Sequence, residues 1–256
     1  MSSLPVLLSA DPEAPFPPVE QALRHPDGLL AVGGDLSPAR LLNAYRHGIF
    51  PWYSQGQPIL WWSPDPRTVF ATDAVRLGSK FRRGLRRSAW EVRADTAFAQ
   101  VIRACAEIPR PGQRGTWITR EMRAAYERMH ELGHAHSFEV FDGERLVGGI
   151  YGIAIGRMFF GESMFSAAPG GSKVALAALA VHLRDWGFPL IDAQVENDHL
   201  LSLGARLWPR PGFLAAVAEL TGQPATVSPW SARVGRWPAA RLADVLRPAG
   251  PLSGHP

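Results

Sequence analysis

Residues 137–165 decide the fold and read SFEVFDGERLVGGIYGIAIGRMFFGESMF. Two apolar, alternating runs in this segment are separated by Asp-Gly-Glu at 142–144, a composition typical of a hairpin turn. Gly-Arg at 156–157 then returns the chain into a third apolar run. The segment therefore predicts a three-stranded antiparallel meander.

Two helices are predicted before the meander. The amphipathic segments 97–108 and 120–133 follow Asp95 and Thr119, which are residue types that begin helices. A basic segment, 76–93, lies further upstream and also contains a candidate helix.

A helix, a strand and a short helix are predicted after the meander. Ser172 is expected to cap a helix over 173–186 that ends at Gly187. The strand PLIDAQ follows at 189–194, and HLLSLGA at 199–205 is a short helix. This order of elements predicts an α+β fold with a mixed, mostly antiparallel sheet, the order of an N-acyltransferase fold.

The chain divides by composition into three parts. Residues 1–65, rich in Pro, Gly and Trp, are predicted to form a small N-terminal domain, in which Ser37 and Pro38 start a helix that stops at Gly48. Residues 66–232 are predicted to form the catalytic domain, and the Pro-rich tail 233–256 is expected to be loosely ordered.

Composition excludes several classes of protein. With 256 residues, 46% of them hydrophobic, the chain can bury a substantial core, so disordered and fibrous proteins are excluded. The single cysteine, Cys105, excludes an internal disulfide and any metal site built from several cysteines. Because the lone cysteine gives no sign of an oxidising compartment, we expect a cytoplasmic protein. No apolar run approaches the about 18 residues that span a bilayer, so we expect no membrane contact.

The cations are almost all arginine and are concentrated in one segment. Lys80 and Lys173 are the two lysines among 27 basic residues. Residues 76–93 hold seven cations against one acid, with Phe81 and Trp90 between them. Arginine suits phosphate because its planar group donates two hydrogen bonds at once, but a solvated helix face has the same composition.

Two motifs have alternative interpretations. His130-Glu131-Leu132-Gly133-His134 matches a zinc-protease motif, but Gly133 is expected to end the helix before the second histidine. The glycines of 148–156 could indicate a nucleotide-binding loop, but their neighbours alternate as in a strand and no Lys-Ser/Thr ending follows. We therefore predict no metal site and no phosphate loop at these positions.

Three polar residues are candidates for chemistry. Asp192 and Gln194 lie at i and i+2 of a predicted strand, so a regular strand would place both side chains on one face. Glu162 is the one acid in an apolar run. Each has a structural alternative, because a buried carboxylate also serves as an ion-pair partner.

Long motifs in one order resemble the leucyl/phenylalanyl-tRNA-protein transferase family over residues 14–210. They are GGDLSPARLLNAYRHGIFPWYSQGQPILWWSPDPR at 33–67, GTWITREM at 115–122, HELGHAHSFEV at 130–140, GGIYGIAIGRMFFGESMFS at 148–166, SK at 172–173 followed by AL at 175–176, and LIDAQVENDHLLSLGA at 190–205. The resemblance implies an N-acetyltransferase-like domain that transfers Leu or Phe from aminoacyl-tRNA to the N-terminal Arg or Lys of proteins. Such transfer creates a signal for proteolysis and needs no cofactor and no metal. We also expect a monomer.

The resemblance also assigns roles to residues. It implies that Asp192, Gln194 and Glu162 are catalytic, with Asp192 polarising the Gln194 amide; whether Gln194 acts as a base or only orients the amine stays open. Trp52 and Trp117 would contact the terminal adenosine. The aminoacyl pocket would consist of Ile150, Phe159, Gly161, Met164, Leu176 and Leu179. Contacts to the tRNA acceptor stem would come from Lys80, Arg82, Arg83, Arg86 and Arg87.

Two pocket positions depart from the family pattern. Ile150 and Leu179 stand where a Met and a Phe are usual, and we expect them to favour Leu over Phe as the transferred residue. Two other functions remain as alternatives. The first is a CoA-dependent N-acetyltransferase on the same fold, and the second is a non-catalytic tRNA-binding module that uses the basic segment and the tryptophans.

Overall fold

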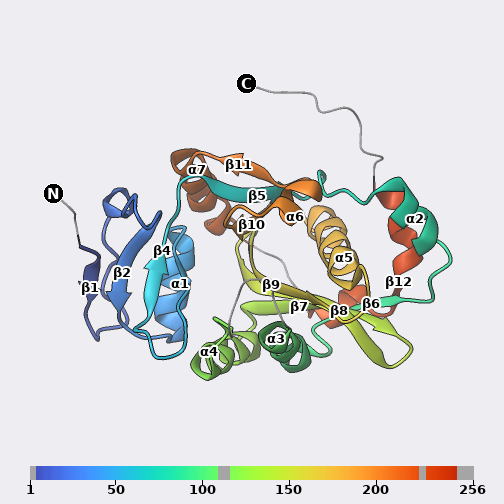
Figure 1. The fold of residues 1–256 in the computed structure, drawn as a ribbon, viewed down its shortest axis with the longest axis horizontal. Coiled ribbons are helices and arrows are strands. Elements are labelled where there is room, and N and C mark those ends of the chain that lie inside the picture. Colours follow the sequence, from blue (N-terminus) through green and yellow to red (C-terminus); the bar gives the residue numbers. More distant parts are fainter. Residues whose placement is uncertain (1–3, 109–115, 225–228, 247–256) are drawn as a thin grey trace.

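The computed structural model describes residues 4–108, 116–224 and 229–246. These residues form two β-sheets with helices packed around them, an α+β fold (Figure 1). The predicted fold class is therefore confirmed.

The N-terminal part contains a four-stranded sheet of order β1-β2-β4-β3. Its strands are β1 (Val6–Leu8), β2 (Leu29–Gly33), β3 (Phe50–Pro51) and β4 (Leu60–Trp62), with a 3-10 turn, η1 (Val19–Gln21), between the first two. Helix α1 (Pro38–Arg46) begins as predicted, because the Ser37 side chain accepts a hydrogen bond from the Arg40 amide and Pro38 occupies the first helical position.

The larger sheet has eight strands of order β11-β5-β10-β9-β8-β7-β6-β12. They are β5 (Arg67–Ala71), β6 (Glu91–Ala94), β7 (Ala135–Asp142), β8 (Arg145–Ile155), β9 (Met158–Ser166), β10 (Leu190–Gln194), β11 (Arg206–Trp208) and β12 (Trp237–Pro238). Strands β7, β8 and β9 form the predicted antiparallel meander, and β10 joins it parallel to β9. The sheet is therefore mixed and mostly antiparallel, as predicted.

Helices cover both faces of the large sheet (Figure 1). Helix α5 (Gly171–Asp185) packs on one face, and α3 (Phe98–Glu107) and α4 (Arg120–Glu131) pack on the other. The remaining helices are α2 (Ser79–Leu85), α6 (Asp198–Ser202), α7 (Arg210–Thr221), α8 (Trp230–Val234) and α9 (Leu242–Val245), with the 3-10 turn η2 (Ala239–Arg241) before α9.

Of the four predicted helix caps, two are confirmed, Ser37 and Thr119, and two are wrong, Asp95 and Ser172. Thr119 caps α4 by accepting a hydrogen bond from the Met122 amide. Asp95 does not cap α3, because its carboxylate accepts hydrogen bonds from the backbone N–H of Ser137 on β7 instead. The cap of α5 is Gly170 rather than Ser172, since the turn into this helix has a φ of 92° that favours glycine.

The C-terminal part differs from the loose tail that we expected for 233–256. Strand β12 pairs with β6, and Ala239, Leu242 and Ala243 are fully buried in or beside the second hydrophobic core. Apolar burial therefore holds this segment against the sheet up to residue 246. Residues 247–256, where the rest of that expectation falls, lie outside the described residues.

The chain leaves the small sheet after β4 and enters the large sheet at β5, close to the boundary at residue 65 that the sequence predicts. One hydrophobic core nevertheless includes Tyr45 and Trp61 from the N-terminal part together with Tyr126 and Phe160 from the larger part. Because these parts share a core, the division at residue 65 stays a prediction.

Candidate functional site

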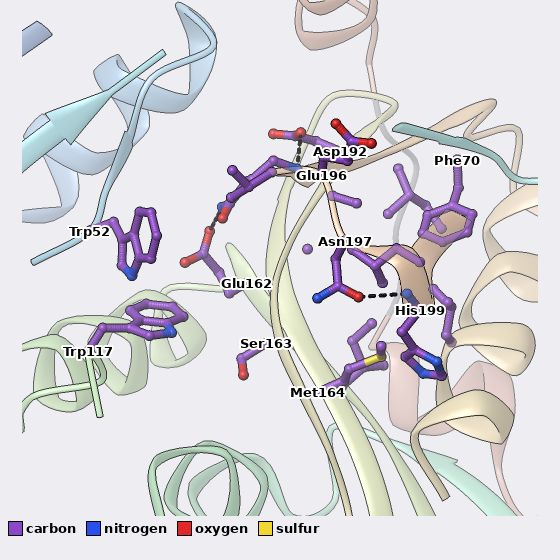
Figure 2. A pocket seen from close by; sticks show the side chains of 18 of the residues that line it. Trp52, Phe70, Trp117, Glu162, Ser163, Met164, Asp192, Glu196, Asn197 and His199 are labelled. Atoms are coloured by element: carbon purple, nitrogen blue, oxygen red, sulfur yellow. Dashed lines mark hydrogen bonds between the residues drawn. The ribbon is translucent and has the colours of Figure 1, made fainter. Parts of the chain in front are cut away.

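A cavity of about 530 Å³ opens between the two parts of the fold. Its lining comes from β9, β10 and the segment up to α6, from single positions on β5, β8 and α5, and from Trp52 and Trp117 (Figure 2). The strand ends of the large sheet therefore meet the N-terminal part at this cavity.

One half of the cavity is apolar. Four of the predicted pocket residues line it, namely Ile150, Gly161, Met164 and Leu176. Phe70 and Ile191, which the sequence analysis did not single out, line it as well, and they are paired across β5 and β10. That pairing of distant segments is what brings Phe70 to the cavity, and no local sequence pattern signals it.

Two predicted pocket residues do not line the cavity. The Phe159 side chain is 1% exposed and packs against Trp230, with ring centroids 6.0 Å apart. Leu179 lies one helical turn beyond Leu176 on α5 and is fully buried in the second core. In this structure both are core residues behind the cavity.

Glu162 is the centre of a buried hydrogen-bond network. Its Oε1 accepts from the Tyr45 hydroxyl at 2.7 Å and from Gln194 Nε2 at 2.7 Å, and its Oε2 accepts from the Tyr126 hydroxyl at 2.9 Å. The two tyrosine hydroxyls also contact each other. Tyr45 comes from α1 and Tyr126 from α4, so the network joins both parts of the fold.

Burial sets the protonation states in this network. It raises the pKa of Glu162 to about 7, although the hydrogen bonds from Tyr45 and Tyr126 act in the opposite direction. It also raises the pKa of both tyrosines well above 10, so both remain hydrogen-bond donors at neutral pH. The sequence singled out Glu162 but not the two tyrosines.

The conformation of Gln194 departs from that of a regular strand. Its φ is 63°, and the pairing of β10 with β5 shifts register between Asp192 and Gln194. The Gln194 backbone N–H donates to Asp192 Oδ1 at 2.8 Å, while its side-chain amide donates to Glu162. The polarisation of the Gln194 amide by Asp192 that we expected is therefore absent in this form, because Asp192 contacts the main chain of Gln194 and Glu162 contacts its amide.

Asp192 forms a buried ion pair. Its carboxylate accepts two hydrogen bonds from Arg67, at 2.9 and 2.7 Å, and both side chains are at most 1% exposed. The Arg67 guanidinium lies 4.7 Å from the ring centroids of both Phe50 and Phe213 and donates to the Gly48 carbonyl. The structural alternative for Asp192, an ion-pair partner, is thus present in the structure.

Trp52 and Trp117 lie on one side of Glu162, and Phe70 and Met164 lie on the other (Figure 2). Trp62 supports Trp52, because its indole N–H donates to the Trp52 carbonyl at 2.7 Å and the rings are 5.8 Å apart. The cavity therefore has an aromatic end and an apolar end, with the Glu162 network between them.

The predicted basic cluster lies apart from this cavity, on and just after α2. Lys80 and Arg83 are exposed. Arg82 instead donates to the Ala243 carbonyl, and Arg86 forms an exposed ion pair with Asp244 at 3.1 Å. Two of the five predicted tRNA contacts are thus engaged by α9 in this structure.

The zinc-protease motif does not form a continuous helix. Helix α4 ends at Glu131, and Gly133 has a φ of 79°. His130 stacks on Phe98, with ring centroids 4.3 Å apart, and hydrogen-bonds to the Ala135 carbonyl. Across the parts of the chain that the structure describes, no group of three or more His, Cys, Asp or Glu is placed to hold a metal ion.

The fold and this site define a class of protein. An α+β fold in which an apolar cavity meets a buried carboxylate, two hydroxyls and an amide suits an acyltransferase, since an apolar acyl group can lie beside groups that orient a nucleophile. Among the described residues, no helix has the length and apolar character needed to cross a bilayer.

Comparison with known proteins gives the particular family. Residues 69–218 match the leucyl/phenylalanyl-tRNA protein transferase family, and residues 34–65 match its N-terminal domain. The leucyl/phenylalanyl-tRNA–protein transferase of Xanthomonas axonopodis pv. citri (strain 306) is 70% identical over 94% of this chain and 97% of its own. The protein of that name from Xylella fastidiosa (strain M23) is 63% identical over 92% of this chain and 97% of its own.

The chain belongs to the leucyl/phenylalanyl-tRNA protein transferase family, and it is an aminoacyltransferase. Among solved structures, FemX is similar with a TM-score of 0.43 and 13% identity, over 67% of this chain and 66% of FemX.

Proposed function

We propose that this enzyme transfers Leu or Phe from the 3′ end of aminoacyl-tRNA to the α-amine of proteins that begin with Arg or Lys. The product would then carry a signal for proteolysis. We further propose that the enzyme acts as a cytoplasmic monomer without metal or cofactor. The high identity to relatives named as leucyl/phenylalanyl-tRNA–protein transferases supports the substrate class.

The observation that carries this proposal is the position of the Glu162 network within the cavity. The apolar half, with Ile150, Met164 and Leu176, suits a Leu or Phe side chain. The aromatic end, with Trp52 and Trp117, suits the terminal adenosine, because a base gains roughly 1 to 3 kcal/mol by stacking on such a ring. The ester bond between these two groups would then lie beside Gln194 and Glu162.

The reaction forms one bond and breaks one. The nitrogen of the acceptor amine attacks the ester carbonyl, a tetrahedral intermediate forms, and the bond from the carbonyl carbon to the ribose oxygen breaks. The proton lost by the amine ends on that ribose oxygen. Because the ester is already activated, the enzyme has to position the reactants and to orient the amine.

Gln194 is the residue that we propose for orienting the amine. Its amide N–H donates to Glu162, so its Oε1 is turned to the other side and is free to accept from the attacking amine. A neutral amide is a weak base, and this arrangement supports orientation rather than proton abstraction. Glu162, Tyr45 and Tyr126 would act as positioning residues that hold the amide in this orientation.

Transfer of labelled Leu from leucyl-tRNA to a protein with N-terminal Arg tests the proposal. The expected result is label on the acceptor, and no label on the same protein with an acetylated N-terminus. Label from acetyl-CoA instead would identify a CoA-dependent N-acetyltransferase. Binding of tRNA without transfer of label would identify a tRNA-binding module, and either result would overturn the proposal.

Specificity should respond to Leu176 and not to Leu179. Leu176→Phe adds a ring to the cavity lining, so phenylalanyl-tRNA should lose kcat/KM relative to leucyl-tRNA by roughly 10- to 100-fold. Leu179→Phe, one turn along the same helix, should overpack the core, lower the melting temperature and leave that ratio unchanged. Competition between the two charged tRNAs measures both ratios. A larger shift from Leu179→Phe would place that residue in the pocket.

A further inference from the structure

The cavity that holds the Glu162 network is rich in carboxylates. Among the described residues that line it, three carry a carboxylate, namely Glu162, Asp192 and Glu196, and none is Lys or Arg. Two of these carboxylates already have partners. Arg67 pairs with Asp192, and the Glu162 carboxylate accepts from two tyrosines and from Gln194. The proposed reaction gives no role to the third, on Glu196.

Glu196 presents a free carboxylate to the cavity. The residue is exposed, and across the described parts of the chain it has neither an ion-pair partner nor a side-chain hydrogen bond. In Figure 2 it lies between Trp52 on one side and Phe70 on the other. An unpaired carboxylate that faces a ligand cavity suits a cationic group of the ligand, because the two charges strengthen the hydrogen bond between them.

The backbone is fixed on both sides of Glu196. Before it, Gln194 has its left-handed conformation, and the Val195 backbone N–H donates to the Ala193 carbonyl at 2.8 Å. After it, the Asn197 side chain caps α6 by accepting from a backbone N–H of that helix at 2.8 Å. The Glu196 side chain therefore leaves the chain from a defined position at the edge of the cavity.

Glu196 is within reach of a side chain attached to the acceptor amine. Gln194 orients this amine in the proposed reaction, and two residues of extended chain place the Cα atoms of 194 and 196 at most about 7 Å apart. Arg and Lys carry their charge at the end of a long methylene stem. With its α-amine at Gln194, an N-terminal Arg or Lys can therefore place its charged group at Glu196.

We propose that Glu196 determines specificity for the acceptor, by accepting hydrogen bonds from the cationic side chain of its N-terminal Arg or Lys. This inference rests on the proposed function, in which Gln194 orients the α-amine of the same residue. Arg donates two hydrogen bonds from its planar group to one carboxylate, whereas Lys presents a point charge, so Arg should be the better acceptor. The same carboxylate repels an acceptor that begins with Asp or Glu.

Two peptides that differ only in the charge of their first side chain test the proposal. Both are pentapeptides of one sequence, and they begin with Arg or with citrulline, in which a neutral urea group replaces the guanidinium. Glu196→Gln should lower kcat/KM for the Arg peptide by roughly 5- to 20-fold and leave kcat/KM for the citrulline peptide unchanged. Glu196→Asp, which keeps the charge on a shorter stem, should retain part of the preference for Arg.

The matched control is Asp198→Asn. Asp198 is an exposed carboxylate two residues further along the same segment, and it does not line the cavity. Its loss changes the net charge by the same amount, so an effect of the overall field would occur in both variants. We expect Asp198→Asn to keep the wild-type ratio of the two kcat/KM values. An unchanged ratio in Glu196→Gln, or an equal fall in both variants, would overturn the inference.

Two further measurements separate this inference from the proposed function. The KM for leucyl-tRNA should be the same in the wild type and in Glu196→Gln, and a rise that matches the loss with the Arg peptide would overturn the inference. If the wild type transfers Leu to no acceptor with N-terminal Arg, the proposed function fails. Calorimetric binding of the two peptides without tRNA still tests Glu196: a preference for the Arg peptide that Glu196→Gln abolishes supports the inference, and equal binding of both peptides by the wild type overturns it.

Discussion

Glu162→Gln is expected to lower kcat by about two to three orders of magnitude while leaving the KM for leucyl-tRNA nearly unchanged. In the wild type, the Glu162 carboxylate accepts from both tyrosines and from the Gln194 amide. The substituted amide keeps an oxygen on one branch only. With that oxygen toward Tyr126, its NH2 group takes the place of Oε1 and faces Gln194 and the Tyr45 hydroxyl, which can donate to Tyr126 instead. Gln194 would then turn its oxygen toward that group and present N–H, a donor, to the acceptor amine.

The pH dependence of stability follows from the same carboxylate. Burial raises the pKa of Glu162 in the folded state to about 7 from its usual 4.5, so the folded state binds the proton more tightly than the unfolded state. This group therefore favours folding below pH 4.5, and that contribution is lost as pH rises from 4.5 to about 7. The change is about 3 kcal/mol by linkage, and Glu162→Gln should remove it from the denaturation free energy.

Glu139→Gln is the matched control for this prediction. Glu139 is also buried, with a pKa raised by burial to about 7, and its partners are Ser137 and Thr96 rather than the residues of the cavity. This substitution should change the pH dependence of stability in the same window and leave kcat unchanged. The acceptor amine of the substrate titrates in the same way with the wild type and with both variants. Differences in kcat between the three enzymes therefore report the role of Glu162. Equal kcat for both variants would contradict the role of Glu162.

The sequence predicted the parts of this fold that local patterns determine. Alternation of apolar residues and the turn at 142–144 predict the meander, and the apolar helix after it predicts α5. The Glu162 network depends instead on Tyr45 and Tyr126, which are 117 and 36 residues away along the chain. Each tyrosine belongs to an amphipathic helix, so in sequence alone it is indistinguishable from a core residue.

Two predictions differ from the structure because tertiary contacts change local geometry. In a regular strand the side chains of Asp192 and Gln194 would leave the same face of the sheet. In the structure, Gln194 has a left-handed conformation and its side-chain amide donates to Glu162, while Asp192 accepts from Arg67. The arginines after Gly78 read as a uniform cluster, but packing of α9 engages Arg82 and Arg86. Neither effect has a signal in the nearby sequence.

Asp192→Asn is expected to destabilise the protein by about 3 to 5 kcal/mol, because it leaves the buried Arg67 guanidinium without its counter-charge. For a chain of this size each kcal/mol lowers the melting temperature by roughly 2 to 4 °C, so the melting temperature should fall by roughly 10 °C. Gln194→Ala removes one hydrogen bond to the Glu162 carboxylate and leaves no buried cation without a counter-charge, so it should destabilise less, by about 1.5 to 3 kcal/mol, with a large loss of kcat and nearly unchanged affinity for tRNA.

The two variants together decide how Asp192 contributes to turnover. Loss of activity in Asp192→Asn has two sources in this structure, since the carboxylate also accepts from the Gln194 backbone N–H and thereby supports its left-handed conformation. The double variant Arg67→Met with Asp192→Leu should recover much of the stability, because no charge stays buried alone, but it still lacks the acceptor for that N–H. We therefore expect a near-normal melting temperature with kcat as low as in Gln194→Ala. Recovery of kcat along with stability would show that the loss of activity in Asp192→Asn comes only from the unpaired charge of Arg67, and that the backbone of Gln194 holds its conformation without the carboxylate.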